Sequence, residues 1–267
     1  MNDLDFTGKI ALVTGGLRGI GLEIVKSFAS RGATVIIADK NEEQSKKVIS
    51  LLRNDNLDVE YHHIDLIDQQ SCKELVNFIK EKHTTVNILV NNARAGIRTS
   101  IESETEDNWD QTFDVNLKAA FSLSRSCIDL MKSQETLGTI VNISSNSSSF
   151  VTPESPSYQM SKAGVEQLTR ILAVHAGQFD IRVNAISPGF IVQNEHQARF
   201  NGPSNEHWKQ TANYSLSLNH VGSSQDVANA ALFLSSDLSS FVTGQVLKVD
   251  GGGCIQDPFH LLFNRPD

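Results

Sequence analysis

The feature that most constrains this chain is a regular alternation of short apolar runs with longer amphipathic stretches. The apolar runs have the length of strands and cover residues 10–13, 34–38, 59–64, 87–90, 139–143, 182–186 and 245–249. Stretches with the apolar spacing of a helix separate them, at 19–30, 42–53, 69–82, 109–132, 158–177 and 224–235. The runs are rich in Val and Ile without clean alternation, as is typical of strands buried on both faces of a parallel sheet. The pattern predicts a doubly wound α/β sheet of about seven parallel strands flanked by helices.

The 267 residues suit one large domain, and no linker or repeat divides residues 1–267. Two segments depart from the alternation. Residues 193–221 are polar and rich in Asn, His and Ser, so we expect a mobile lid beside the substrate. The C-terminal tail, residues 254–267, contains apolar residues from Phe259 to Phe263, so we expect it to pack on its own subunit or on a neighbour.

Composition excludes several classes of function. A net charge of -8 gives no basic face for nucleic acid, and no apolar run approaches the 18 residues of a membrane span. The N-terminal residues lack the pattern of a secretory signal. Cys72, Cys127 and Cys254 lack metal-site spacing, which favours reduced thiols. We therefore expect a cytoplasmic protein with a small-molecule substrate, without a nucleic-acid or membrane partner and without a metal.

A glycine-rich turn follows the first strand directly, with the sequence TGGLRGIG at residues 14–21. Gly15 permits a tight turn, Gly19 lets the backbone approach a phosphate, and Gly21 lets the helix pack closely on its strand. The helix N-terminus adds unpaired N–H groups and a partial positive charge. A strand before the turn and a helix after it favour a dinucleotide site over an ordinary turn. The expected cofactor contacts here are Gly15, Leu17, Arg18 and Ile20.

Acidic residues end the second and third strands. Asp39 can accept hydrogen bonds from both hydroxyls of an adenosine ribose and would repel a 2′-phosphate, which favours NAD over NADP. The alternatives are that Asp39 only caps the next helix, or that Arg18 or Lys40 meets a 2′-phosphate. Asp65, with Leu66 beside it, can hold the adenine amino group, unless Asp65 is a plain helix cap.

The sequence YQMSK places Tyr158 and Lys162 four positions apart, on one face of a long helix. Tyrosine ordinarily loses its proton near pH 10, and a neighbouring ammonium favours the phenolate and lowers that pKa. A Tyr–Lys pair alone is common surface chemistry. Ser145 follows the strand 139–143, where its hydroxyl can hold a substrate oxygen at the mouth of the sheet. The three residues together predict general acid–base chemistry on an alcohol or carbonyl.

The complete set of motifs resembles the short-chain dehydrogenase/reductase family. The matching motifs are TGGLRGIG, NNA at 91–93, the Asn of VNL at 115–117, ISS at 143–145, YQMSK and VNAISPG at 183–189. They occur in the family's order and spacing, and the similarity runs from about residue 8 to residue 252. The resemblance implies a Rossmann-like fold and an NAD(P)-dependent oxidoreductase that acts on CH–OH groups. It also implies a homotetramer in which helices 109–132 and 158–177 pair between subunits.

The resemblance also implies roles for residues of the site. Tyr158 would be the acid in reduction and the base in oxidation, and Lys162 would bind the nicotinamide ribose and lower the pKa of Tyr158. Ser145 would orient the substrate oxygen, with Ser144 as the alternative, and Asn116 would hold a water that passes protons to solvent. The further cofactor contacts implied are Asn92, Ala93, Tyr158, Lys162, Pro188, Gly189 and Ile191.

Two positions depart from the family pattern. Gln193 stands where many members have a threonine that binds the nicotinamide carboxamide, and Arg94 replaces the glycine of NNAG. A guanidinium is costly to bury unpaired, so Arg94 must reach solvent, a protein carboxylate or an anionic ligand. Candidate protein partners are Glu102, Glu104 and Asp39. The sharper hypothesis is that Arg94, alone or with Arg98, binds a substrate carboxylate or phosphate. The residues expected to contact substrate are Arg94, Ser145, Tyr158 and Gln193.

Three functions compete. The leading one is an NAD-dependent oxidoreductase that interconverts a secondary alcohol and a ketone on a small polar, possibly anionic substrate, such as a sugar derivative. A 3-oxoacyl-[acyl-carrier-protein] reductase using NADPH is the alternative enzyme, although Asp39 and the acidic charge disfavour it. A sensor or scaffold that binds NAD without turnover is the alternative of another class.

Overall fold

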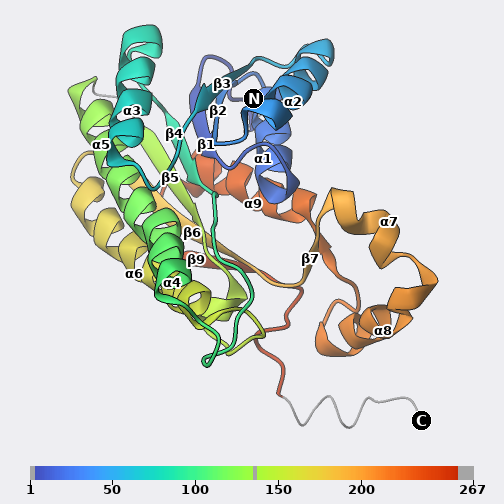
Figure 1. Ribbon diagram of the computed structural model, residues 1–267. Coiled ribbons are helices and arrows are strands. Elements are labelled where there is room, and N and C mark those ends of the chain that lie inside the picture. Colours follow the sequence, from blue (N-terminus) through green and yellow to red (C-terminus); the bar gives the residue numbers. More distant parts are fainter. Residues whose placement is uncertain (1–3, 135–136, 258–267) are drawn as a thin grey trace.

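The computed structural model, which describes residues 4–134 and 137–257, confirms the expected sheet (Figure 1). Its seven strands are all parallel and lie in the order β3-β2-β1-β4-β5-β6-β9. They are β1 (Ile10–Thr14), β2 (Thr34–Asp39), β3 (Val59–His63), β4 (Ile88–Asn91), β5 (Gly138–Ile143), β6 (Ile181–Pro188) and β9 (Val246–Val249). The strand order reverses between β1 and β4, and in sheets of this type ligands bind at such a switch point, beyond the carboxyl ends of the strands.

Helices cover both faces of the sheet (Figure 1). One layer contains α1 (Gly19–Ala29), α2 (Glu42–Asn54) and α9 (Ser224–Ser235); the other contains α3 (Gln69–His83), α4 (Glu106–Phe113), α5 (Ala119–Ser133) and α6 (Pro156–Gly177). Each helix layer packs on one face of the sheet and forms an apolar core with it. Val35 and Ile37 pack in the core of α1 and α9, whereas Ile36 between them packs in the core of α3 and α5. Strands buried on both faces explain why no polar alternation marks them in the sequence.

The helix expected over 109–132 starts earlier and is not regular. It consists of α4, a π-helical segment at Asp114–Lys118 and then α5. Thr105 caps its start by accepting a hydrogen bond from the backbone N–H of Asn108. A π-helical turn contains an extra residue and is common at functional sites. Asn116 lies in this turn and is buried.

The segment expected as a lid contains two short helices, α7 (Gln197–Phe200) and α8 (Glu206–Ser215). Two strands of two residues each, β7 (Ile191–Val192) and β8 (Gly222–Ser223), pair across its base. The side chain of Asn194 donates a hydrogen bond to Glu23 of α1 at 3.0 Å, which ties this base to the first helix. The apolar residues of the tail from Phe259 to Phe263 lie outside the described residues.

No helix within residues 4–134 and 137–257 is long and apolar enough to span a membrane. Over the same residues, no cluster of three His, Cys, Asp or Glu side chains could hold a metal ion. All three cysteines are free, and Cys72 and Cys127 are buried. Burial raises the pKa of the Cys127 thiol to about 12, so this thiol stays protonated at neutral pH.

Candidate active site

The turn between β1 and α1 has the shape that a diphosphate requires. Gly15 and Gly19 have φ angles of +67° and +55°, in the left-handed region that favours glycine. A Cβ on Gly21 would lie 2.2 Å from the carbonyl oxygen of Gly15. The Arg18 side chain does not cap the start of α1, and among residues 4–134 and 137–257 no side chain accepts a hydrogen bond from the first N–H groups of this helix. These groups and the helix dipole suit an anion, so the turn fits the diphosphate of a dinucleotide.

A second turn, after β4, is fastened to the first. Asn92 donates hydrogen bonds from its side-chain amide to the carbonyl oxygens of Thr14 and Gly15, at 2.9 and 3.0 Å. The backbone N–H groups of Asn92 and Ala93 donate to the Thr14 hydroxyl at 3.0 and 3.1 Å. Thr14 was not among the residues expected at the site, although it opens the TGGLRGIG motif. The contacts hold the two turns together at the switch point of the sheet.

Asp39 is the last residue of β2, and Asp65 lies two residues beyond the end of β3. One carboxylate oxygen of Asp39 accepts a hydrogen bond from the backbone N–H of Asn41 at 3.0 Å. Asn41 caps α2, and Asp68 caps α3. The alternative of plain helix caps therefore does not describe Asp39 or Asp65. Within the described ranges, the second carboxylate oxygen of Asp39 has no hydrogen-bond partner, so it remains available to a ribose hydroxyl.

Tyr158 and Lys162 lie one turn apart at the start of α6. Ser155 caps this helix by accepting a hydrogen bond from the backbone N–H of Tyr158. The Lys162 Nζ lies 5.7 Å from the centre of the Tyr158 ring and donates to the carbonyl oxygen of Ile143 at 2.7 Å. Lys162 is buried, and this burial, with a smaller contribution from the Arg94 guanidinium, lowers its pKa to about 7. An ammonium with such a pKa exchanges its proton easily at neutral pH.

The environment of the Tyr158 phenol differs from the expectation that Lys162 lowers its pKa. Burial raises the pKa of Tyr158 above its ordinary value, while Arg94 and a hydrogen bond with Ser145 act to lower it. The Arg94 guanidinium carbon lies 5.8 Å from the centre of the Tyr158 ring. The Arg94 guanidinium is thus a second cation, besides Lys162, near the Tyr158 ring.

Asn116 points from the π-helical turn toward the segment after β4. Its side-chain oxygen accepts from the backbone N–H of Ala95 at 2.8 Å, and its amide donates to the Ser161 hydroxyl at 3.0 Å. A cavity of about 10 Å³ is lined by Thr14, Leu66, Asn91, Asn116 and Lys162, among others. That volume is on the order of what one water molecule needs.

Two neighbouring serines at the end of β5 have different surroundings. The Ser144 hydroxyl is buried and donates to the backbone carbonyl of Lys162 and to Glu166, at 3.2 and 3.1 Å. Ser145 is half-buried, and its hydroxyl acts to lower the pKa of the Tyr158 phenol. Of the two hydroxyls, that of Ser145 is the one beside the phenol.

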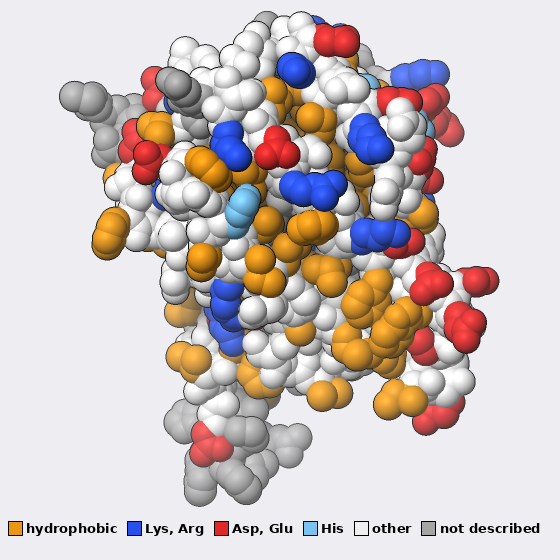
Figure 2. Space-filling view, turned by 90° about the vertical axis from the view of Figure 1, so that its left-hand side faces the viewer, with side chains coloured by type: hydrophobic (Ala, Val, Ile, Leu, Met, Phe, Trp, Pro, Cys, Tyr) orange, Lys and Arg blue, Asp and Glu red, His pale blue; other side chains and the backbone are white. Residues whose placement is uncertain are grey.

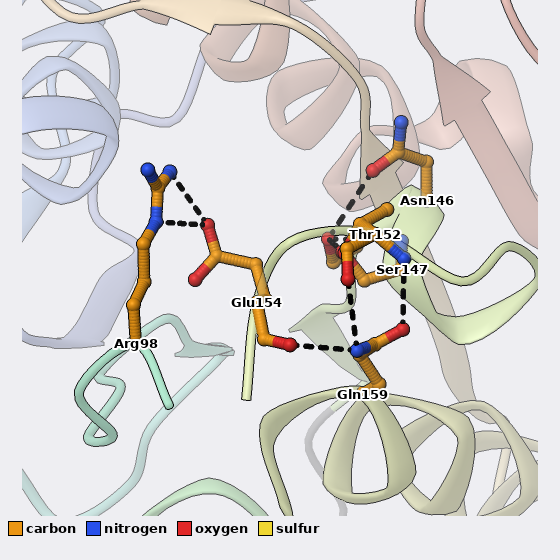
Figure 3. A network of polar contacts seen from close by, with 7 residues as sticks. Arg98, Asn146, Ser147, Thr152, Glu154 and Gln159 are labelled. Atoms are coloured by element: carbon orange, nitrogen blue, oxygen red, sulfur yellow. Dashed lines mark hydrogen bonds and ion pairs between the residues drawn. The ribbon is translucent and has the colours of Figure 1, made fainter. Parts of the chain in front are cut away.

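Arg94 is exposed and has no hydrogen-bond or ion-pair partner within the part of the chain that the structure describes. Two of its three expected protein partners, Glu102 and Glu104, form hydrogen bonds elsewhere, and no ion pair joins Arg94 to the third, Asp39, within the described residues. Glu102 accepts from Ser100, and Glu104 accepts from the Thr99 and Ser157 hydroxyls. Arg98 donates two hydrogen bonds to one oxygen of Glu154, at 2.8 and 3.0 Å (Figure 3). Arg94 thus places a free cation next to Tyr158.

The residues after β6 border the same site. The backbone N–H of Gly189 donates to the carbonyl oxygen of Val249 at 2.9 Å, and Ile191 begins β7 half-buried. The Gln193 side chain extends to the glycine-rich turn, because a Cβ on Gly19 would lie 2.5 Å from its side-chain oxygen. The structure therefore places Gln193, expected at the substrate, against the turn that fits the diphosphate.

These features define a class of protein. A doubly wound sheet, a dinucleotide turn at its switch point, and a Tyr–Lys–Ser–Asn constellation beside it make a nicotinamide-dependent oxidoreductase. The comparisons with known proteins narrow this class to a family.

A family model described as enoyl-(acyl carrier protein) reductase matches residues 15–253. The 3-oxoacyl-[acyl-carrier-protein] reductase of Chlamydia pneumoniae is 35% identical over 250 residues, which cover 94% of this chain and 98% of the relative. A putative gluconate dehydrogenase of Agrobacterium tumefaciens superposes with a TM-score of 0.88 at 30% identity, over 96% of this chain and all of that one. A gluconate 5-dehydrogenase of Burkholderia cenocepacia, in complex with NADP and tartrate, superposes with a TM-score of 0.86 at 26% identity, over 96% and 99%. The chain belongs to the short-chain dehydrogenase/reductase family and is an NAD(P)-dependent oxidoreductase acting on CH–OH groups.

Proposed function

We propose that this enzyme oxidises a secondary alcohol, or reduces the matching ketone, on a small polar substrate with a carboxylate, such as a sugar acid. The observation on which this substrate class rests is the free guanidinium of Arg94 beside Tyr158. An arginine fork suits a carboxylate, and charge-assisted hydrogen bonds are the strong ones. The structural likeness to a gluconate 5-dehydrogenase whose complex contains tartrate, a hydroxy acid, supports the same class.

The proposed chemistry assigns one step to each residue. The nicotinamide, when bound, accepts or supplies the hydride at the reacting carbon. The Tyr158 phenol takes the alcohol proton in oxidation and returns it in reduction, and the Ser145 hydroxyl holds the substrate oxygen at hydrogen-bonding distance. Lys162 and Asn116 line the cavity from which a water would pass the proton on to solvent. Gly15, Arg18 and the α1 N-terminus would hold the diphosphate, and Pro188, Gly189 and Ile191 the nicotinamide end.

Replacement of Arg94 by Gln tests the substrate class. D-gluconate and D-sorbitol share a carbon skeleton and differ in the carboxylate, so only the first should need the guanidinium. A hydrogen bond to a charged group contributes about 1.5–3 kcal/mol, so we expect kcat/KM to fall roughly 10- to 150-fold on gluconate and little on sorbitol. Initial rates of NADH formation measure both.

Arg31→Gln, in a turn distant from the site, is the matched control, since its guanidinium donates to the Ser27 carbonyl. Equal losses on gluconate and sorbitol in Arg94→Gln would contradict the proposed substrate. Such losses, with a pH–rate profile moved to higher pH, would assign Arg94 to the Tyr158 phenol instead, because removing a cation raises the phenol pKa.

We also propose that NAD is preferred to NADP, on the basis of Asp39. A carboxylate at the end of β2 accepts from ribose hydroxyls and repels a 2′-phosphate. Replacement of Asp39 by Ser should raise kcat/KM for NADPH and lower it for NADH, each by roughly 10-fold or more, since Lys40 and Arg18 then remain as cations nearby. A wild-type enzyme that already uses NADPH tenfold better would refute the preference.

A 3-oxoacyl-[acyl-carrier-protein] reductase is the second candidate, favoured by the 35% identity to the enzyme of Chlamydia pneumoniae. Its acidic carrier calls for a basic surface, whereas this chain has a net charge of -8. Turnover of acetoacetyl-[acyl-carrier-protein] with NADPH, faster than that of any hydroxy acid, would favour this candidate.

For its assembly and location we propose a homotetramer in the cytoplasm. The face formed by the helices around α5 and α6 carries apolar side chains among lysines and arginines (Figure 2). Exposed apolar residues of these helices include Phe121, Ile171 and Val174, the last 84% exposed. Pairing of α4–α5 and α6 between subunits would cover them, and the free cysteines suit a reducing compartment.

A further inference from the structure

The side chain of Gln159, the residue after Tyr158, is hydrogen-bonded to the loop of residues 146–154, which leads into α6 (Figure 3). Its amide oxygen accepts a hydrogen bond from the backbone N–H of Thr152 at 3.0 Å. Its amide nitrogen donates to the carbonyl oxygens of Thr152 and Glu154, at 3.2 and 2.7 Å. One side chain on the rigid helix thus bonds three main-chain groups of the loop.

The contacts continue from Thr152 to the substrate side. The Thr152 hydroxyl lies 2.9 Å from the hydroxyl of Ser147, which is buried. Ser147 meets Ser145 twice, through its own hydroxyl at 3.2 Å and its backbone N–H at 3.2 Å. The Ser145 hydroxyl in turn acts on the Tyr158 phenol, whose pKa it lowers. The chain of contacts leaves α6 at Gln159 and returns to it at Tyr158, the preceding residue.

Apolar packing contributes little to fixing this loop. Val151 is 96% exposed, and Phe150 and Pro153 are exposed as well. The loop is tied on its outer side by the ion pair of Glu154 with Arg98, whose side chain is 76% exposed (Figure 3). An ion pair that meets solvent contributes little. The amide of Gln159 therefore links the outer part of this loop, residues 149–154, to α6, while the Ser148 hydroxyl, which donates to Glu166, links the part next to Ser145 to the same helix.

We propose that Gln159 is a positioning residue: it holds residues 146–154 so that the Ser145 hydroxyl stays directed at Tyr158 and at the substrate oxygen. Its role does not depend on which alcohol is oxidised or on the identity of the cofactor. Methionine at this position keeps the length of the side chain and removes all three hydrogen bonds. Gln159→Met should therefore free the loop and leave α6 intact.

Hydrogen exchange measured by mass spectrometry tests, without any substrate, whether the Gln159 hydrogen bonds hold the loop. Peptides covering residues 146–155 of Gln159→Met should exchange roughly 10-fold faster than in the wild type, since an opened loop loses protection at amides such as Thr152. Gln70→Met is the control, because Gln70 is an exposed residue of α3 whose side chain, among the described residues, donates only to Glu74. Unchanged exchange in this loop would overturn the proposal.

A double-mutant cycle tests whether Gln159 acts through Ser145. The probe is reduction of 2,3-butanedione, a neutral diketone that does not need Arg94. With Ser145 present, Gln159→Met should lower kcat roughly 10-fold, since small misplacements of a positioning group cost one to two decades, and leave the KM for the cofactor unchanged. In Ser145→Ala the same change should cost less than about twofold, because the two act as a unit. The same factor in both backgrounds would show a general structural effect and refute the proposal.

Discussion

Tyr158→Phe is expected to lower kcat by about 1,000-fold, within the range of general acid–base catalysis, and to leave NADH binding within about twofold of the wild type. Phenylalanine keeps the ring that Arg94 and Lys162 face but removes the hydroxyl that gives and takes the proton. Turnover is followed by the absorbance of NADH, and binding by its fluorescence.

The control for this variant is Tyr214→Phe in α8, which removes the same hydroxyl from the lid segment. It should leave kcat within about a factor of three, because Tyr214 is half-buried and is not among the residues proposed to move the proton. Turnover retained in Tyr158→Phe would remove Tyr158 from the chemistry. A wild type that binds NADH tightly but turns over none of the alcohols tested would instead favour an NAD-binding sensor.

Lys162→Met is expected to lower kcat/KM by roughly 100-fold, since it removes both a ribose ligand and a cation beside the phenol. Methionine fits the buried space without leaving an unpaired charge there. Cofactor binding should weaken as well, in contrast to Tyr158→Phe, and this difference separates the two roles.

The pKa of Lys162 predicts how cofactor binding depends on pH. Burial lowers that pKa to about 7, and within the described residues the ammonium donates one hydrogen bond, to Ile143. Ribose hydroxyls accept from the charged form, so binding raises the pKa again and linkage makes the complex tightest where Lys162 is protonated. NADH affinity should therefore fall as the pH rises through about 7.

Titrations of NADH fluorescence between pH 6 and 9 would show this fall, which Lys162→Met should abolish. A wild-type affinity that stays flat across this range would mean that Lys162 keeps its proton state on binding.

The central strands of the sheet could be predicted because strands buried on both faces require continuous Val- and Ile-rich runs, whereas the edge strands β3 and β9 are only partly buried. Elements that do not require a continuous apolar run could not be predicted from the sequence. β7 and β8 are two residues long, too short for any periodicity. The amphipathic spacing of 109–132 continues through the π-helical segment, so the sequence predicts one regular helix where the structure has three parts.

In the site, too, some residues could be predicted from the sequence and others could not. Tyr158, Lys162 and the glycines are marked by spacing, because their chemistry needs fixed distances along a helix or turn. The surroundings of Arg94 depend on pairings made elsewhere. Arg98 and Glu154 are 56 positions apart and satisfy each other, which leaves Arg94 free. The role of Gln159 could not be predicted from the sequence. It is a polar residue inside YQMSK, and its partners are main-chain atoms that no sequence pattern specifies.

The π-helical turn at Asp114–Lys118 has a consequence for protein engineering. One extra residue in a helix rotates everything beyond it by roughly 100° about the axis. A helical-wheel diagram drawn across residues 106–133 therefore assigns α4 and α5 to faces that do not correspond. Any attempt to recode this surface, for example to make a monomer, must use two separate wheels. Deleting one residue from the turn would straighten the helix and turn Asn116 away from Ala95, which should uncouple the proposed proton relay while the sheet stays intact.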